Sequence, residues 1–84
     1  MYEVVLSRDA ARTLERLTPA MRARIFKALE RVRANPLKEK RLRGELEGLF
    51  SVRIGEMRAV YEVNSDQKIM VVHAIGPRGD IYKG

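Results

Sequence analysis

The chain has 84 residues and no cysteine, and its 17 Lys and Arg outnumber 11 Asp and Glu to give a net charge of +6. This length predicts one small domain over residues 1–84, and the lack of cysteine excludes disulfides and thiolate metal sites. We expect a cytoplasmic protein, since no signal pattern or membrane-spanning run is found. The positive charge favours nucleic acid or an acidic protein as partner, although a bias toward arginine would also raise the charge.

The first half of the chain predicts one strand and two helices. Residues 2–6 read as a strand, and Ser7 is expected to cap a helix over residues 8–17. Thr18, followed by proline, is a specific signal for a second helix that runs to about residue 34. The apolar stripe of this helix should be core, whereas its basic side is either solvated or docks nucleic acid.

Residues 38–44 are strongly basic and predict a linker. Such a loop is either simply solvated or able to contact a phosphate backbone. Its cations are therefore the candidates for binding RNA or the ribosome: Lys38, Lys40, Arg41 and Arg43.

Residues 49–63 predict a β-hairpin, with Gly55 first in a two-residue type II′ turn. Pairing across this turn puts Arg53 opposite Arg58, where repulsion is about 1 kcal/mol in water and about 3 kcal/mol at a dielectric of about 20. The pair indicates an anion site, unless the two heads splay into water or an acid such as Glu62 neutralises them. The other face is apolar and must be covered: Phe50, Val52, Ile54, Met57, Ala59, Tyr61 and Val63.

Residues 68–75 predict a last strand, apolar on both faces and therefore central and covered. The expected turn before it would put His73, the only histidine, opposite Arg58 on the arginine face. That histidine is either structural or an accessory group that exchanges protons near neutral pH. Two glycines and a proline should then break the strand and turn the tail, with Arg78 and Tyr82 just beyond it.

The element order is β-α-α-β-β-β, which predicts an α+β fold. The two helices should pack on the apolar face of a small, mainly antiparallel, four-stranded twisted sheet. The other face is expected to stay open and basic. If the tail folds over that face, three guanidinium groups and a phenol converge there.

Three stretches carry a family resemblance: Leu42-Arg43-Gly44, Val52-Arg53-Ile54-Gly55-Glu56-Met57-Arg58-Ala59-Val60-Tyr61, and Gly76-Pro77-Arg78 followed by Asp80-Ile81-Tyr82. With these motifs and its element order, the whole chain resembles the RelE/ParE toxin superfamily of bacterial and archaeal type II toxin–antitoxin pairs. The resemblance implies a RelE-like fold.

For the RelE branch, the resemblance implies an mRNA interferase, an endoribonuclease that enters the ribosomal A site and inhibits translation. It cuts mRNA by metal-free attack of the ribose 2′-OH and needs no cofactor. Arg53 matches a basic catalytic residue, Arg58 a contact to the scissile phosphate, and Arg78 an aid to the leaving group. Tyr82 matches a tyrosine that orients or stacks on the mRNA.

One position departs from the family pattern. Ser51 stands where many active relatives have lysine, and arginine hardly deprotonates, so Arg53 is a poor general base. Either Arg53 acts only electrostatically, with ribosomal RNA or His73 helping, or the protein is slow.

The resemblance also implies a cognate acidic, RelB-like antitoxin, bound as an extended peptide in a complex that is heterotetrameric or larger. The ribosome and its mRNA would be the other partners. Two alternatives stay open: a ParE-like inhibitor of DNA gyrase, which would need no arginine cluster, and a weakly active or non-catalytic member that acts through antitoxin binding.

Overall fold

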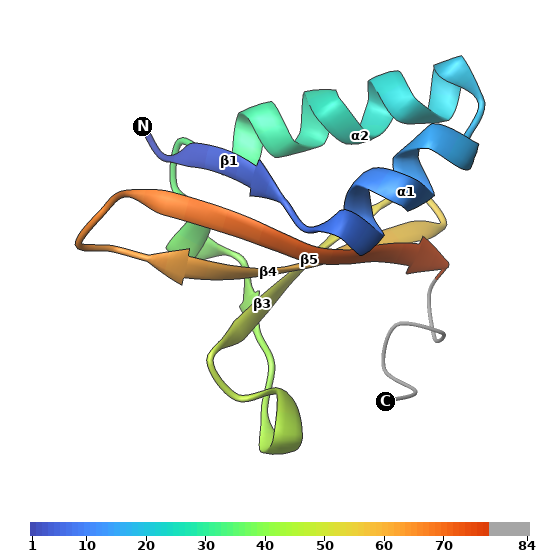
Figure 1. Ribbon diagram of the computed structural model, residues 1–84. Helices are drawn as coiled ribbons and strands as arrows, with labels where there is room; N and C mark the ends of the chain where they lie inside the picture. The colour runs from blue at the N-terminus through green and yellow to red at the C-terminus, as the bar shows by residue number, and fades with distance from the viewer. Residues whose placement is uncertain (78–84) are drawn as a thin grey trace.

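The computed structural model describes residues 1–77 and shows two helices on one face of a five-stranded sheet (Figure 1). In chain order the elements are β1 (Glu3–Leu6), α1 (Arg8–Arg16), α2 (Pro19–Val32), η1 (Pro36–Lys38), β2 (Lys40–Arg41), η2 (Gly44–Leu46), β3 (Leu49–Ile54), β4 (Met57–Asn64) and β5 (Ile69–Pro77). The strand order is β1-β5-β4-β3-β2, and only the β1–β5 pair is parallel. The predicted α+β class and mainly antiparallel sheet are confirmed.

Both helices begin at the predicted caps. The Ser7 hydroxyl oxygen accepts the backbone N–H of Ala10 at 3.0 Å, and that of Thr18 accepts the N–H of Met21 at 3.2 Å. Ser7 Oγ also donates to the His73 carbonyl at 2.7 Å, which ties the start of α1 to β5. Neither α1 nor α2 is long and apolar enough to cross a membrane.

The face of the hairpin that the sequence marks as apolar is the one that the helices cover. Tyr61 lies at its centre, fully buried, with its ring stacked on Phe50 at 5.5 Å between centroids. Its hydroxyl donates to the Pro36 carbonyl at 2.6 Å and so fastens the segment after α2 to the sheet. Burial raises the pKa of Tyr61 above its ordinary value, and the negative charge of Glu39 raises it further.

The β3–β4 hairpin has the predicted register. Arg53 lies opposite Arg58, and Phe50 lies opposite Tyr61. Gly55 has a φ of 62°, as the first loop position of a type II′ turn requires.

Two predictions about the extent of the strands are wrong. The basic stretch 38–44 is more than a linker, because Lys40 and Arg41 pair with β3 and form a fifth strand, β2. Gly76 and Pro77 do not break the last strand, since β5 continues through both and pairs with β4. A proline is tolerated there because β1 pairs only with residues 69–72 of β5, so within residues 1–77 the level of Pro77 has a paired strand on one side alone.

The predicted register between β4 and β5 is also wrong. The turn between these strands takes four residues, and an irregularity in the middle of β4 shifts the pairing. Arg58 therefore lies opposite Gly76 and not opposite His73. The central position of β5 is confirmed, because it lies between β1 and β4.

Candidate nucleic-acid interface

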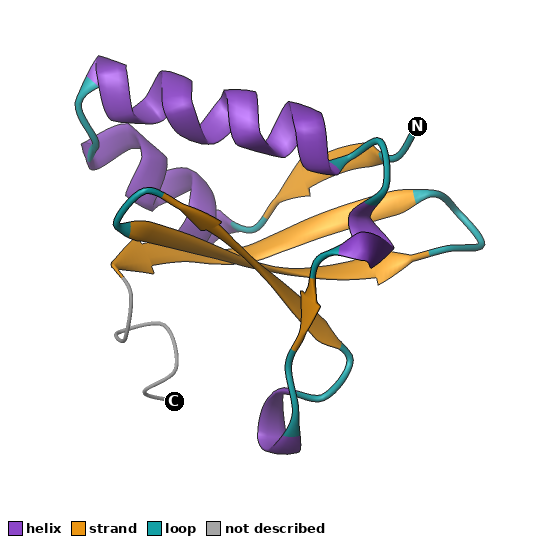
Figure 2. Cartoon of the chain, turned by 180° about the vertical axis from the view of Figure 1, so that it is seen from behind, coloured by secondary structure: helices purple, strands orange, loops and turns teal. Residues whose placement is uncertain are grey.

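The open face is the side of the sheet turned away from α1 and α2, which both lie above it in Figure 2. Its central side chains come from β3, β4 and β5. Ser51 and Val60 are buried and Arg58 is half-buried, whereas Glu62 and His73 are exposed.

Arg58 is positioned on the open face by a serine of the neighbouring strand. Its Nη1 donates to Ser51 Oγ at 2.9 Å, from diagonal positions of β3 and β4. Ser51 is only 3% exposed, so this acceptor is fixed in place. A guanidinium that is positioned before a ligand arrives can stabilise phosphate charge without reorganising.

Arg53 has different neighbours, although it is the cross-strand partner of Arg58. Arg53 is exposed and is one of the residues that line a groove together with Arg24, Lys27 and Arg31 of α2. Arg58 thus donates to Ser51, whereas Arg53 is exposed beside the basic residues of α2. The sequence marks the basic side of α2 as either solvated or able to dock nucleic acid, but it does not single out these three residues, whose spacing of three and then four residues was the available signal.

His73 does lie on the open face, as predicted, but its partner is a carboxylate. Its Nε2 is 2.7 Å from Glu62 Oε1, and both side chains are partly exposed. Glu62 therefore pairs with His73. Glu62 is four positions after Arg58 on β4, a distance of about 13 Å along a strand.

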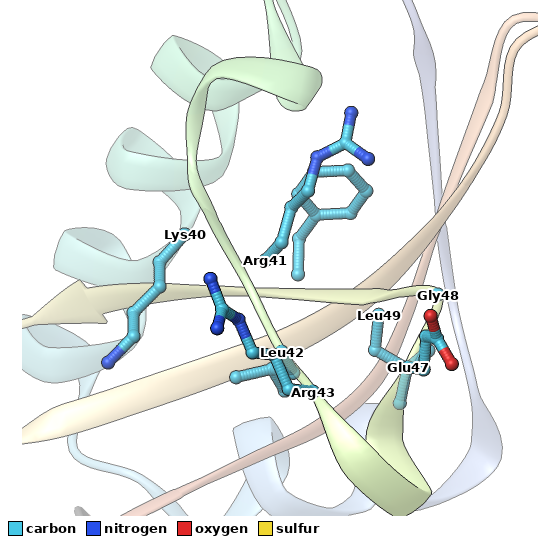
Figure 3. Close-up of a pocket in the computed structure, with 8 residues that line it drawn as sticks. Lys40, Arg41, Leu42, Arg43, Glu47, Gly48 and Leu49 are labelled. Carbon is cyan, nitrogen blue, oxygen red and sulfur yellow. The ribbon is translucent and has the colours of Figure 1, made fainter.

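A second basic region is the pocket between β2 and the loop that leads into β3 (Figure 3). It has a volume of about 580 Å³, and the side chains of Lys40, Arg41 and Arg43 line it, with Glu47 on the opposite side of the view. The Arg41 guanidinium carbon lies 5.3 Å from the centroid of the Phe50 ring, a cation–π contact that orients it.

The basic pocket brings together three of the four cations predicted to bind RNA. Lys38 is exposed in η1 but does not line the pocket. Arg78 and Tyr82 lie outside the described residues. The convergence of three guanidinium groups and a phenol on the open face therefore stays a prediction.

Comparison with known proteins gives a family match over residues 4–82, to the ParE toxin of type II toxin–antitoxin systems, parDE. The chain is 33% identical to Toxin RelG of Mycobacterium tuberculosis over 84 residues, which cover 98% of this chain and 97% of the relative.

Two solved structures share the fold. The toxin–antitoxin complex RelBE2 of Mycobacterium tuberculosis contains a chain with a TM-score of 0.84 and 32% identity, covering 92% of this chain and 98% of that one. The intact RelBE toxin–antitoxin complex of E. coli contains one with a TM-score of 0.81 and 21% identity, covering 92% and 96%.

Proposed function

Because the chain belongs to the RelE/ParE toxin superfamily of type II toxin–antitoxin systems, we propose that it is a ribosome-dependent mRNA endonuclease. In this role it would enter the ribosomal A site, cut the mRNA there and inhibit translation. The observation that carries the proposal is the Arg58 guanidinium, fixed by Ser51 Oγ on a sheet face that neither α1 nor α2 covers.

The proposed reaction needs no metal ion. The ribose 2′-OH loses its proton and attacks the adjacent phosphorus, and the bond from phosphorus to the 5′-oxygen breaks. The leaving oxygen takes up a proton from water, so the products are a 2′,3′-cyclic phosphate and a free 5′-OH. Negative charge grows on the phosphoryl oxygens during the attack. Arg58 would donate to these oxygens, and losing one such donor typically costs about 10²- to 10³-fold in rate.

A proton must leave the 2′-OH, and arginine cannot accept it. On the open face, the His73 imidazole carries ring nitrogens that can donate or accept hydrogen bonds, and Glu62 fixes its ring. His73 lies on β5 three residues before Gly76, which pairs with Arg58, so it is about 10 Å along the strand from the level of Arg58, beside a flanking nucleotide. We therefore assign His73 an accessory role and assign the acceptance of the proton to ribosomal RNA.

A cognate antitoxin is the second part of the proposal. Both solved relatives named above are toxin–antitoxin complexes. In this chain a groove of about 300 Å³ lies between β1, α1 and α2, and the residues that line it include Leu6, Leu14 and Phe26. Phe26 is 47% exposed, so the groove suits the apolar side chains of a partner peptide.

A gyrase inhibitor is the second candidate function, because the matched family is that of ParE toxins. Such an inhibitor acts on a protein, so it would not depend on a fixed arginine on the open face.

Mapping of mRNA 3′ ends in a translation extract tests the proposal. The purified protein is expected to create new 3′ ends within codons in the A site. The Arg58→Met variant keeps the aliphatic stem but loses the charge, so the yield of these 3′ ends should fall about 10²-fold. Arg12→Met removes an exposed arginine from α1 and is the matched control.

The outcomes separate the candidates. If Arg58→Met cuts as well as the wild type, the site assignment is wrong. If no ends form but purified gyrase is inhibited in a supercoiling assay, the second candidate is correct. If neither effect is seen, the chain is a non-catalytic member that acts through its antitoxin.

A further inference from the structure

We propose that α2 and the end of β3 form a second RNA-binding site that holds the phosphate backbone of double-helical RNA. This cation groove has a volume of about 440 Å³ and is lined by Arg24, Lys27, Ala28, Arg31, Arg53, Ile54 and Gly55. It carries four cations and no carboxylate. The inference rests on the proposed function, because the ribosome is the source of such RNA for this protein.

The basic residues of α2 divide into two groups, and the first group is structural. Arg22 donates from Nε to the Leu14 carbonyl and from Nη2 to the Leu17 carbonyl, each at 3.0 Å, and so closes the end of α1. Arg33 donates from Nε to the Tyr2 carbonyl at 2.8 Å. These two arginines stabilise the fold and are not available to a ligand.

The second group lines the cation groove. Arg24, Lys27 and Arg31 are exposed and form a stripe about 10 Å long, seven residues at about 1.5 Å each. The only carboxylate of α2, Glu30, is 3.2 Å from Arg33, and within residues 1–77 no ion pair reaches the stripe. Like charges at this spacing destabilise a helix by about 0.2–0.5 kcal/mol per pair, a cost that a bound anion would offset.

The hairpin supplies the other wall of the cation groove. The β3–β4 turn lies on the helix side of the sheet (Figure 2), and the Arg24 Nη1 atom is 3.8 Å from where a Cβ on Gly55 would be. Arg53 reaches the same groove from β3. A phosphate bound between the two walls would therefore receive charged hydrogen bonds from both elements.

The lining favours a nucleic acid backbone over an acidic peptide. Its two apolar side chains, Ala28 and Ile54, are buried, so the side chains that the groove presents to a ligand are those of its four cations. A phosphate backbone, in contrast, derives its affinity from cations alone, through release of counterions. The apolar groove beside Phe26 has the opposite character.

Two triple variants of equal charge test the proposal. Arg24→Gln/Lys27→Gln/Arg31→Gln alters the cation groove, and Arg8→Gln/Arg12→Gln/Arg16→Gln alters α1; each lowers the net charge from +6 by three, to +3. Glutamine is a good helix former, so both should fold, as circular dichroism can verify. Binding to a fluorescent RNA duplex of about 20 base pairs is followed by anisotropy between about 50 and 200 mM salt.

The triple variant of the cation groove (the groove triple) is expected to bind the duplex at least about tenfold more weakly than the triple variant of α1 (the α1 triple). For the groove triple, the slope of the logarithm of the association constant against the logarithm of the salt concentration should become shallower by about 2 to 3, because each lost phosphate contact lowers the slope by about 0.9. The α1 triple should lose less than about one unit of slope. If the groove triple does not fold, Arg24→Gln and Arg31→Gln singly should each weaken binding about threefold.

Equal losses in the two triples would overturn the proposal, because binding would then depend on net charge and not on a site. It would also be overturned if polyglutamate displaced the duplex from the wild type and lost affinity for the groove triple as the duplex does, because the cation groove would then bind an acidic peptide. In the ribosome assay, the groove triple should need at least about tenfold more protein for half-maximal cleavage. If the wild type cleaves nothing, the proposed function fails, while the duplex measurement still decides the cation groove.

Discussion

Arg58 donates a hydrogen bond from Nη1 to Ser51 Oγ at 2.9 Å, between neighbouring strands of the open face. Many active relatives resembled by this sequence have a lysine in place of that serine. In this chain a neutral, buried hydroxyl therefore accepts from the arginine, where a second cation would repel it. Ser51 thus positions Arg58 through a hydrogen bond and adds no positive charge beside it.

Ser51→Ala should separate positioning from charge. Without the hydroxyl, Arg58 must be ordered as the reaction proceeds, so we expect the cleavage rate to fall about tenfold, equivalent to about 1.4 kcal/mol. The free energy of unfolding should fall by about 1 kcal/mol. Ser65→Ala, in the exposed β4–β5 turn, is the control in the same ribosome assay. An unchanged rate for Ser51→Ala would show that the hydrogen bond does not position Arg58 for catalysis.

The basic pocket should contribute to ribosome affinity. Lys40→Gln/Arg43→Gln removes two of its three cations and leaves the Arg41–Phe50 contact intact. We expect the salt slope of ribosome binding, measured by sedimentation, to become shallower by about 1.5 to 2. Arg8→Gln/Arg12→Gln serves as the control of equal charge, and the same change in both would argue against a local contact.

Sequence reasoning succeeded where the signals are local. The caps at Ser7 and Thr18 and the turn at Gly55 each depend on a few adjacent residues, so both helices and the Arg53–Arg58 pairing were predicted correctly. The register of β4 with β5 depends on a distant strand and an irregularity that no short motif encodes, and there the prediction failed.

The candidate site shows the same limit. Pairing two arginines in register does not reveal that Arg58 donates to Ser51, or that Arg53 lies beside the basic residues of α2, because both depend on tertiary packing. The basic residues of α2 also look alike in sequence, although Arg22 and Arg33 are structural and Arg24, Lys27 and Arg31 are not. Only the packing of α1 and β1 against α2 distinguishes them.

The division of the α2 arginines into structural and exposed residues predicts that replacing Arg22 lowers the free energy of unfolding more than replacing Arg24 does. Arg22→Ala removes both hydrogen bonds to the end of α1 and should lower the free energy of unfolding by about 1.5–3 kcal/mol. Arg22→Lys should recover only part of it, because lysine lacks the planar fork. Arg24→Ala, which is exposed, should change stability by less than about 0.5 kcal/mol. Urea unfolding measures all three, and equal costs at the two positions would refute the division.

Tyr61→Phe should destabilise the fold by about 1–2 kcal/mol, because it leaves the Pro36 carbonyl without its hydrogen bond of 2.6 Å. In a domain of this size the melting temperature should fall by about 4–8 °C for each kcal/mol. Tyr2→Phe is the matched control, since the Tyr2 side chain is also buried but its hydroxyl makes no hydrogen bond within residues 1–77. Equal melting temperatures for the two variants would contradict a structural role for the Tyr61 hydroxyl.

Tyr61 should also make stability depend on pH at the alkaline end. Its pKa in the folded state is raised above the ordinary value of 10.0 by burial and by Glu39. Above about pH 10 the unfolded chain loses this proton while the folded chain keeps it, so the unfolded state binds fewer protons. The free energy of unfolding must then fall as pH rises, by up to about 1.4 kcal/mol per pH unit from this group.

The comparison with Tyr61→Phe isolates this contribution, because phenylalanine cannot titrate. The stability difference between the wild type and the variant should be constant from about pH 7 to 9 and should shrink between about pH 10 and 11. Urea unfolding at each pH provides the measurement. A difference that stays constant to pH 11 would mean that the Tyr61 hydroxyl ionises as readily in the folded chain as in the unfolded one, contrary to its burial and its hydrogen bond to Pro36.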